Sequence, residues 1–167
     1  CARQGVNTVF IGAIGQDALG ECAKNFAADE GLEACWQCRD DMPTAASSIV
    51  VNAQGENMIA VSLAANEFLD VSFLQAQARQ FENAGIVLCQ LENNLDAIGF
   101  AFGLGKKNGA LCILNPAPVH PELAHDLLDA ADILTPNETE FALLCQRFAN
   151  MALTADQVAQ TDDAMLH

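Results

Sequence analysis

The sequence contains few basic residues and no long apolar run. Its 167 residues include 7 Lys and Arg against 22 Asp and Glu, which gives a formal net charge of -15. An acidic surface of this kind repels nucleic-acid backbones and anionic membranes. No apolar stretch approaches the roughly 18 residues needed to cross a bilayer, and the N-terminus lacks the basic-then-apolar pattern of a secretory signal. We therefore expect a soluble, cytoplasmic protein with no nucleic-acid or membrane partner.

Several catalytic motifs are also missing. The sequence has no Gly-x-Ser-x-Gly element and no Cys with a nearby His in a known signature, so covalent catalysis has no support. His120 and His125 are five residues apart and cannot share a helix face as zinc ligands. The glycines around Lys106 look like a phosphate loop, but no Ser or Thr follows. We interpret that stretch as a helix C-terminus carrying cationic residues.

The cysteines do not form a disulfide framework by their number or spacing. There are seven, an odd number at irregular intervals, which favours reduced and mostly buried thiols. Cys35 and Cys38 have the spacing of a redox pair, but such a pair follows a strand and opens a helix. Here the pair follows a predicted helix and lies in a predicted strand, where the two side chains point to opposite faces. We do not expect redox function.

The composition predicts a globular protein. Apolar residues make up 51% of the chain, which is enough to bury a core, and its length suits one domain over residues 1–167. The chain opens at Cys1 without an initiator Met and stops at residues 164–167 without a turn signal. On this pattern we expect an internal piece of a longer protein.

The first part of the chain predicts a strand, a helix and a hairpin. Residues 7–14 are β-branched and aromatic, and a glycine-containing turn follows them. Asp17 is a helix N-cap, and apolar residues recur at helical spacing until Gly31. Two short strand-like runs, residues 46–52 and 58–63, flank a polar connection with a glycine. These runs predict a β-hairpin.

The second part alternates between strand and helix patterns. We expect helices near residues 71–83, 94–108, 121–131 and 138–148, and strands at residues 85–91, 110–115 and 132–135. The strands of residues 85–91 and 110–115 are continuous apolar runs, as in parallel strands with helices on both faces. The fold class is therefore α/β, with a three-layer parallel sheet. Ligands bind such sheets at the carboxyl ends of the strands, which here means Glu92, residues 115–118 and residues 135–138.

Three of these features each have two interpretations. Glu92 follows an apolar strand and either faces a ligand or complements the dipole of the next helix. Asn137 and Glu140 either contact a ligand or form a capping box, and the pattern alone favours the box. Gly12, Gly15 and Gly20 follow a strand and precede a helix, and either bind a dinucleotide or serve only as tight-turn glycines. They lack the spacing of the dinucleotide-binding turn, so tight turns explain them adequately.

Five segments of the sequence resemble the ribokinase-like family of sugar kinases, in the same order and at similar spacing. They are Gln90-Leu91-Glu92, residues 114–118 (LNPAP), residues 132–140 (DILTPNETE), residues 10–20 (FIGAIGQDALG) and residues 54–59 (QGENMI). The likeness runs from residue 1 to about residue 148. The Asn-Pro and Thr-Pro-Asn-Glu elements are specific to this family as a set.

The resemblance implies ATP-dependent phosphorylation of a sugar hydroxyl, with ribose the leading substrate and ribose 5-phosphate the product. By the same resemblance Glu92 contacts sugar hydroxyls, Asn137 contacts the phosphates of ATP, and Glu140 organises Mg²⁺ through water. The hairpin over residues 46–63 would form part of a lid, and a homodimer is a further implication. A carboxylate that fixes a hydroxyl and another that anchors hydrated magnesium suit phosphoryl transfer.

The sequence also departs from the family pattern. The glycine-rich sugar-binding motif would precede Cys1, and the motif with the catalytic base would follow His167. No residue of this chain is therefore assigned as the base, the K⁺-activation site would lie outside it, and we expect the chain alone to be inactive. Ala45 and Ala64 stand where the family commonly has Gly. Two other functions stay open: a dinucleotide-binding oxidoreductase domain and a non-catalytic sugar-binding domain.

Overall fold

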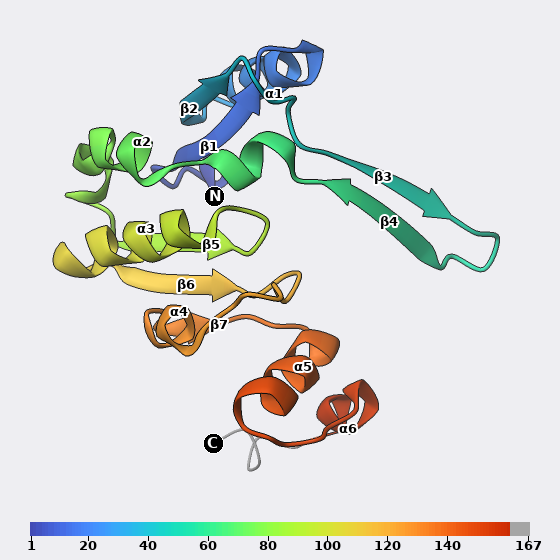
Figure 1. Ribbon diagram of the computed structural model, residues 1–167. Coiled ribbons are helices and arrows are strands. Elements are labelled where there is room, and N and C mark those ends of the chain that lie inside the picture. Colours follow the sequence, from blue (N-terminus) through green and yellow to red (C-terminus); the bar gives the residue numbers. More distant parts are fainter. Residues whose placement is uncertain (161–167) are drawn as a thin grey trace. The chain divides into compact units, whose positions relative to one another are not determined.

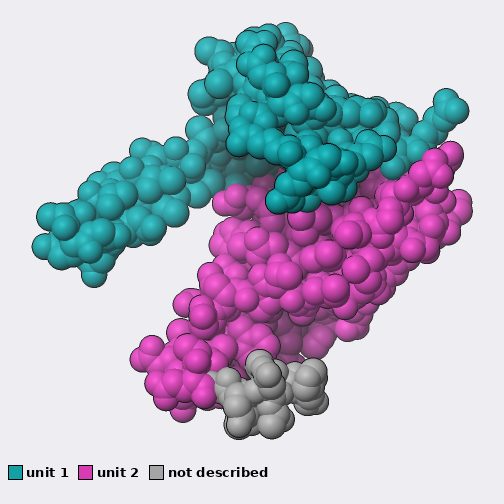
Figure 2. Space-filling model, turned by 180° about the vertical axis from the view of Figure 1, so that it is seen from behind, with its two compact units in different colours: residues 1–80 teal, residues 81–167 magenta. Residues whose placement is uncertain are grey.

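The computed structural model describes residues 1–160, so the interpretation placed on residues 164–167 lies outside it. The chain divides into two compact units, Cys1–Gln80 and Phe81–His167, which are coloured separately in Figure 2. A single domain over residues 1–167 remains a prediction. No helix within residues 1–160 is both long enough and apolar enough to cross a membrane.

The first unit contains a parallel strand–helix–strand element. A short 3₁₀ turn, Ala2–Gln4, precedes strand β1 (Val9–Gly15), helix α1 (Ala18–Asp29) and strand β2 (Glu33–Arg39). The two strands pair in parallel, and the rings of Phe10 and Trp36 lie 5.2 Å apart on them. Asp17 caps α1 by accepting a hydrogen bond from the Gly20 amide, as the sequence predicts.

The predicted hairpin is confirmed. Strands β3 (Ala46–Val51) and β4 (Asn57–Ser62) pair antiparallel, and they extend as an arm in Figure 1. The turn between them holds Gly55 at φ 83°, which is a left-handed conformation that suits glycine. Every residue of both strands is exposed. Ala64, which follows the arm, has φ 40°, so it stands in a region that glycine occupies with less strain.

The end of the first unit corrects one predicted helix. A 3₁₀ turn, Ala64–Phe68, leads to helix α2, which spans only Val71–Ala76, and a further 3₁₀ turn follows at Ala78–Phe81. The expected helix over residues 71–83 is therefore wrong in its second half. The amide of Gln77 bonds to the carbonyls of both Phe73 and Leu74, which tightens the helix into the 3₁₀ turn.

The second unit is built on a parallel sheet. Its strands are β5 (Ile86–Gln90), β6 (Leu111–Asn115) and β7 (Ile133–Leu134), in the order β5-β6-β7. Helices α3 (Leu95–Lys107), α4 (His125–Asp129), α5 (Glu138–Phe148) and α6 (Ala155–Ala159) alternate with or follow the strands, as Figure 1 shows. The parallel α/β fold is confirmed. The helix expected over residues 121–131 is wrong in its first turn, because the carbonyls of residues 120, 121 and 123 bond to Arg147 instead.

Helix α3 packs closely on one face of this sheet. Phe102 of α3 is fully buried, as are Cys112 and Leu114 of β6. A Cβ atom on Gly105 would sit 2.8 Å from Cγ2 of Val87, so glycine permits the close approach of helix and sheet. The alternate residues of the strands remain exposed, with Ile86 at 59% and Leu88 at 65%. The described part of this unit thus buries one face of its apolar strands.

The position of Phe102 allows a test of this core. Replacing Phe102 by Ala removes a fully buried ring, so the free energy of unfolding should fall by about 3–5 kcal/mol. Chemical denaturation measured by circular dichroism reports the change. The same replacement at Phe26, which is 60% exposed on α1, is the matched control and should change stability by less than about 1 kcal/mol. Equal losses at the two positions would contradict the assigned core.

Asp17 gives a second test through pH. Hydrogen bonds from the Thr44 amide, the Thr44 hydroxyl and the Gly20 amide lower the pKa of Asp17 from 3.8 to about 2. Because the folded-state pKa lies below the ordinary value, ionised Asp17 stabilises the fold above about pH 4, and this contribution disappears as the pH falls to about 2. The difference in melting temperature between the natural chain and Asp17→Asn should shrink over that interval. A difference that stays constant from pH 6 to pH 2 would contradict this contribution.

Candidate functional site

The candidate site lies along one edge of the β5-β6-β7 sheet. The three strands are parallel neighbours, so their carboxyl ends reach the same edge. Glu92 follows β5, residues 115–118 begin at the last residue of β6, and Asn137 follows β7. With neighbouring strands roughly 5 Å apart, the two outer strands are separated by roughly 10 Å. The second unit therefore brings all three predicted segments to one edge, with the β6 segment between the other two.

Glu92 is held by a neighbour that the sequence analysis did not single out. The side-chain amide of Gln90 donates a 3.0 Å hydrogen bond to Oε2 of Glu92, and Oε1 of Gln90 accepts from the Glu92 amide. Gln90 is the last residue of β5 and Glu92 lies in the bend that follows, two residues along the chain. An ionised carboxylate accepts at about four lone-pair positions, so Glu92 can accept further donors.

The helix that follows Glu92 is capped by a different residue. Oδ1 of Asn94 accepts from the amides of Asp96 and Ala97 at 2.9 and 3.2 Å, and Asp96 is the acidic residue of the first turn. Glu92 lies two residues before the cap. Asp96 complements the α3 dipole from within the first turn. The cap of α3 is therefore formed without Glu92, and the sugar contact of Glu92 stays a prediction.

The segment after β6 turns back towards the end of β5. The Leu91 amide donates to the carbonyl of Ala117 over 3.3 Å, and Pro116 and Leu91 are both fully buried. On the other side the Thr135 amide donates to the Leu114 carbonyl at 3.0 Å, which continues the pairing of β6 and β7. These bonds fix the backbone at the edge from which Glu92 and Asn137 emerge.

Asn137 and Glu140 form the capping box that the sequence pattern favours. Oδ1 of Asn137 accepts from the Glu140 amide at 2.8 Å, and Oε2 of Glu140 accepts from the Asn137 amide at 2.9 Å. A third bond runs from Nδ2 of Asn137 to Oε1 of Glu140 at 3.0 Å. The structure thus brings these two predicted residues into direct contact, and Glu92 stands apart from them along the edge.

The residues of the edge fit a hydrated magnesium ion. Within residues 1–160 no group of three or more His, Cys, Asp or Glu side chains is arranged to enclose a metal. Magnesium usually keeps several waters and takes only one or two protein carboxylates beside substrate phosphates. Glu140 offers one carboxylate with lone pairs left over, at a helix N-terminus whose amides favour phosphate.

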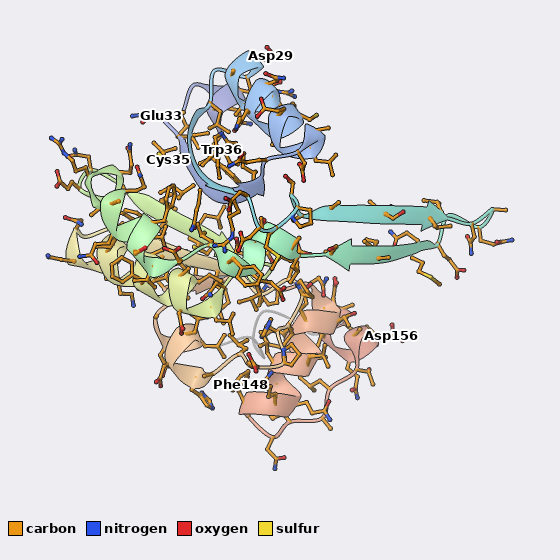
Figure 3. The ribbon with its side chains drawn as sticks, turned by 45° about the horizontal axis from the view of Figure 1, so that its top comes forward. Asp29, Glu33, Cys35, Trp36, Phe148 and Asp156 are labelled. Atoms are coloured by element: carbon orange, nitrogen blue, oxygen red, sulfur yellow. The ribbon has the colours of Figure 1, made fainter. Side chains whose placement is uncertain are left out.

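The cysteine pair lies within a strand and not at the start of a helix. Cys35 and Cys38 lie on β2, as predicted, and Figure 3 shows Cys35 beside Trp36 on that strand. Both thiols are free, and burial raises the pKa of Cys35, which disfavours the reactive thiolate. In the second unit burial raises the pKa of Cys89 to about 12.

Gly15, at the end of β1, and Gly20, in the first turn of α1, allow close backbone packing. A Cβ atom on Gly20 would lie 2.3 Å from the carbonyl oxygen of Gly15, and one on Gly15 would lie 2.5 Å from the carbonyl oxygen of Met42. These close approaches account for the two glycines without a dinucleotide. Lys106 lies in the last turn of α3 and pairs with Asp132 at 3.5 Å, as expected of a helix C-terminus.

Comparison with known proteins identifies the class. The sequence model of the pfkB family of carbohydrate kinases matches residues 1–165, and the chain belongs to this family. Several of its relatives within the family are ribokinases, and two are deoxyribokinases. The chain is 35% identical to ribokinase of Haemophilus influenzae over 144 residues, a match that covers 86% of the chain and 47% of the relative.

Solved structures agree with this assignment. The structure of Arabidopsis thaliana ribokinase complexed with ribose and ATP aligns with a TM-score of 0.68 at 28% identity, over 95% of this chain and 51% of that one. Ribokinase from Giardia lamblia has a TM-score of 0.81 at 24% identity, over 99% of this chain and 50% of that one, and supports the fold. The chain spans about half the length of the relatives that it matches.

The capping box predicts different effects for its two members. Asn137→Ala removes the acceptor for the Glu140 amide and should lower the free energy of unfolding by about 1 kcal/mol. Glu140→Gln keeps an oxygen that can accept from the Asn137 amide, so stability should change by less than about 0.5 kcal/mol. Urea denaturation measures both. A larger loss for Glu140→Gln than for Asn137→Ala would contradict the box.

Proposed function

We propose that the chain forms part of an ATP-dependent kinase that transfers the γ-phosphoryl group of ATP to a hydroxyl of a sugar, with ribose the substrate and ribose 5-phosphate the product. The observation that carries the proposal is the edge of the β5-β6-β7 sheet in a pfkB-family chain, where Glu92 and Asn137 follow parallel strands and Glu140 lies in the first turn of α5. The structure of an Arabidopsis relative contains ribose and ATP, which supports the choice of both substrates.

In this proposal Glu92 binds the sugar. Its carboxylate would accept hydrogen bonds from sugar hydroxyls, and an ionised acceptor binds a hydroxyl more strongly than a neutral one. The Gln90 amide fixes Oε2 of Glu92 from one side and so orients the carboxylate before the sugar arrives. A group held in place in advance loses less conformational entropy on binding.

The opposite end of the edge would take ATP. Asn137 would contact its phosphates, and Glu140 would hold Mg²⁺ through bound water. The magnesium ion would neutralise charge on the phosphates during transfer. The sugar oxygen forms the new bond to phosphorus, the bond to the bridging oxygen of ADP breaks, and the hydroxyl proton passes to a base. We assign that base, and any K⁺ site, to residues outside this chain, and we expect the isolated chain not to turn over.

The β3-β4 hairpin would contribute to a lid over the sugar. It exposes apolar side chains, including Val50 with an exposed fraction of 65% and Met58 with 76%. A patch of this kind commonly marks an interaction surface. A two-stranded hairpin is marginal alone, and pairing with the hairpin of a second copy would cover these side chains. We therefore propose a homodimer. We place the protein in the cytoplasm, where ATP is available and where its seven free cysteines stay reduced.

Two charge-removing substitutions in the complete kinase test the site assignment. Glu92→Gln should raise the KM for ribose about 10- to 100-fold, because hydrogen bonds to a charged acceptor are replaced by weaker ones. Glu140→Gln should lower kcat about 100-fold by weakening charge stabilisation at the phosphates. A coupled ADP-release assay measures both parameters.

Neighbouring acids provide matched controls. Asp96→Asn removes one charge in the first turn of α3, and Glu138→Gln removes one in the first turn of α5. Each should leave KM and kcat within about threefold of the natural values, since neither residue is assigned to a substrate. If the controls changed activity as much as the test substitutions, the roles given to Glu92 and Glu140 would be wrong.

A further inference from the structure

The two strands of the hairpin are joined to the first unit only at their roots. All residues of β3 and β4 are exposed, so side-chain packing along the arm does not hold it in one direction. The chain enters β3 through residues 42–44 and leaves β4 at residue 63. The contacts of these two short segments therefore determine where the arm points.

Thr44, two residues before β3, is bonded on several sides. Its amide donates to Oδ2 of Asp17 at 2.7 Å, and its hydroxyl donates to Oδ1 of Asp17 at 2.7 Å. The same hydroxyl oxygen accepts from the Gly15 amide at 2.9 Å. Because Oδ1 of Asp17 also accepts from the Gly20 amide at 2.8 Å, the root of β3 is tied to the end of β1 and to the start of α1.

Two glycines let the backbones approach closely at this point. A Cβ on Gly15 would lie 2.6 Å from the amide nitrogen of Thr44, and one on Gly20 would lie 3.0 Å from the Thr44 hydroxyl oxygen. The root of β4 joins the same place, since the amide of Ala65 donates to the Pro43 carbonyl at 3.0 Å and Ala65 is fully buried. Both ends of the arm thus meet at residues 43–44.

We propose that Asp17 and Thr44 form a clasp that fixes the direction of the β3-β4 hairpin, and that they are positioning residues for sugar binding. The second part rests on the proposed function, because it takes the hairpin as part of the lid. Neither residue needs to touch the sugar. The hydrogen bonds lower the pKa of Asp17 to about 2, so its carboxylate stays ionised and the clasp stays closed at neutral pH.

Loosening the clasp should leave the hairpin intact and let it move about its root. Sugar would then bind only to the fraction of molecules with the arm correctly placed, and the apparent affinity would fall by that fraction. The loss of the hydroxyl bonds should reduce this fraction about 3- to 10-fold. Chemistry after binding would proceed as before, so kcat should change little.

The test compares Thr44→Val with Thr44→Ser. Valine has the shape of threonine without the hydroxyl, and serine keeps the hydroxyl and its bonds to Asp17 and Gly15. Asp70→Asn is a control cap in the same unit, because Asp70 accepts from Phe73, Ser72 and Gln37 instead of the hairpin root. Amide hydrogen exchange of each variant is followed by NMR or mass spectrometry, and sugar kinetics are measured on the complete kinase.

In the exchange experiment Thr44→Val should speed exchange at Gly15 and Ala65 about 3- to 10-fold, while the amides of Val50 and Met58, which face each other at a hydrogen-bonded position of the hairpin, keep their rates. Thr44→Ser and Asp70→Asn should leave the root unchanged. The clasp is overturned if Gly15 and Ala65 exchange as slowly in Thr44→Val as in Thr44→Ser. It is also overturned if root and arm lose protection together, because the hairpin would then unfold instead of moving as one piece.

In the kinetic experiment Thr44→Val should raise the KM for ribose about 3- to 10-fold with kcat within about twofold, and Thr44→Ser should restore both. Equal KM values for Thr44→Val and Thr44→Ser would overturn the positioning role. A natural enzyme that phosphorylates no sugar would overturn the proposed function together with this role, whereas the exchange result decides the clasp without any activity.

Discussion

The parallel pairing of β5, β6 and β7 is the constraint on which the candidate site depends. Its backbone hydrogen bonds deliver three segments, far apart in sequence, to one edge of the sheet. The close packing of α3 stabilises this arrangement, since Phe102 and Gly105 let the helix lie directly on Val87 and Cys112. Without this parallel pairing, Glu92 and Asn137 would not lie on the same edge of the sheet.

Several residues combine a structural role with a role in the proposed chemistry. Asn137 and Glu140 satisfy helix amides that would otherwise lack partners, and the same geometry holds a carboxylate and an amide where phosphate and hydrated magnesium would bind. Gln90 similarly orients Glu92. This arrangement makes the site stiff before any ligand arrives, which suits a reaction that depends on positioning and charge neutralisation.

Local patterns in the sequence predicted most helices and strands. They could not predict contacts between residues that are far apart in the chain. Apolar periodicity and caps placed β1, α1, the hairpin, α3 and α5 within a residue or two, because those signals depend on near neighbours. The predicted helices over residues 71–83 and 121–131 were too long, since backbone bonds at Gln77 and the side chain of Arg147 ended or displaced them. The spacing of three residues between Asn137 and Glu140 predicted the capping box. The bond between Asp17 and Thr44 joins residues 27 apart, and no local pattern predicts it.

The most direct test of the central claim identifies the product of the reaction. The complete kinase is incubated with ATP, Mg²⁺ and ribose, and the mixture is followed by ³¹P NMR and mass spectrometry. The account predicts that the γ-phosphate signal of ATP disappears as ADP forms together with a phosphate monoester on the primary hydroxyl of ribose. It also predicts that this conversion stops when Mg²⁺ is chelated. Release of inorganic phosphate alone, or no conversion with ribose or any other sugar, would contradict it.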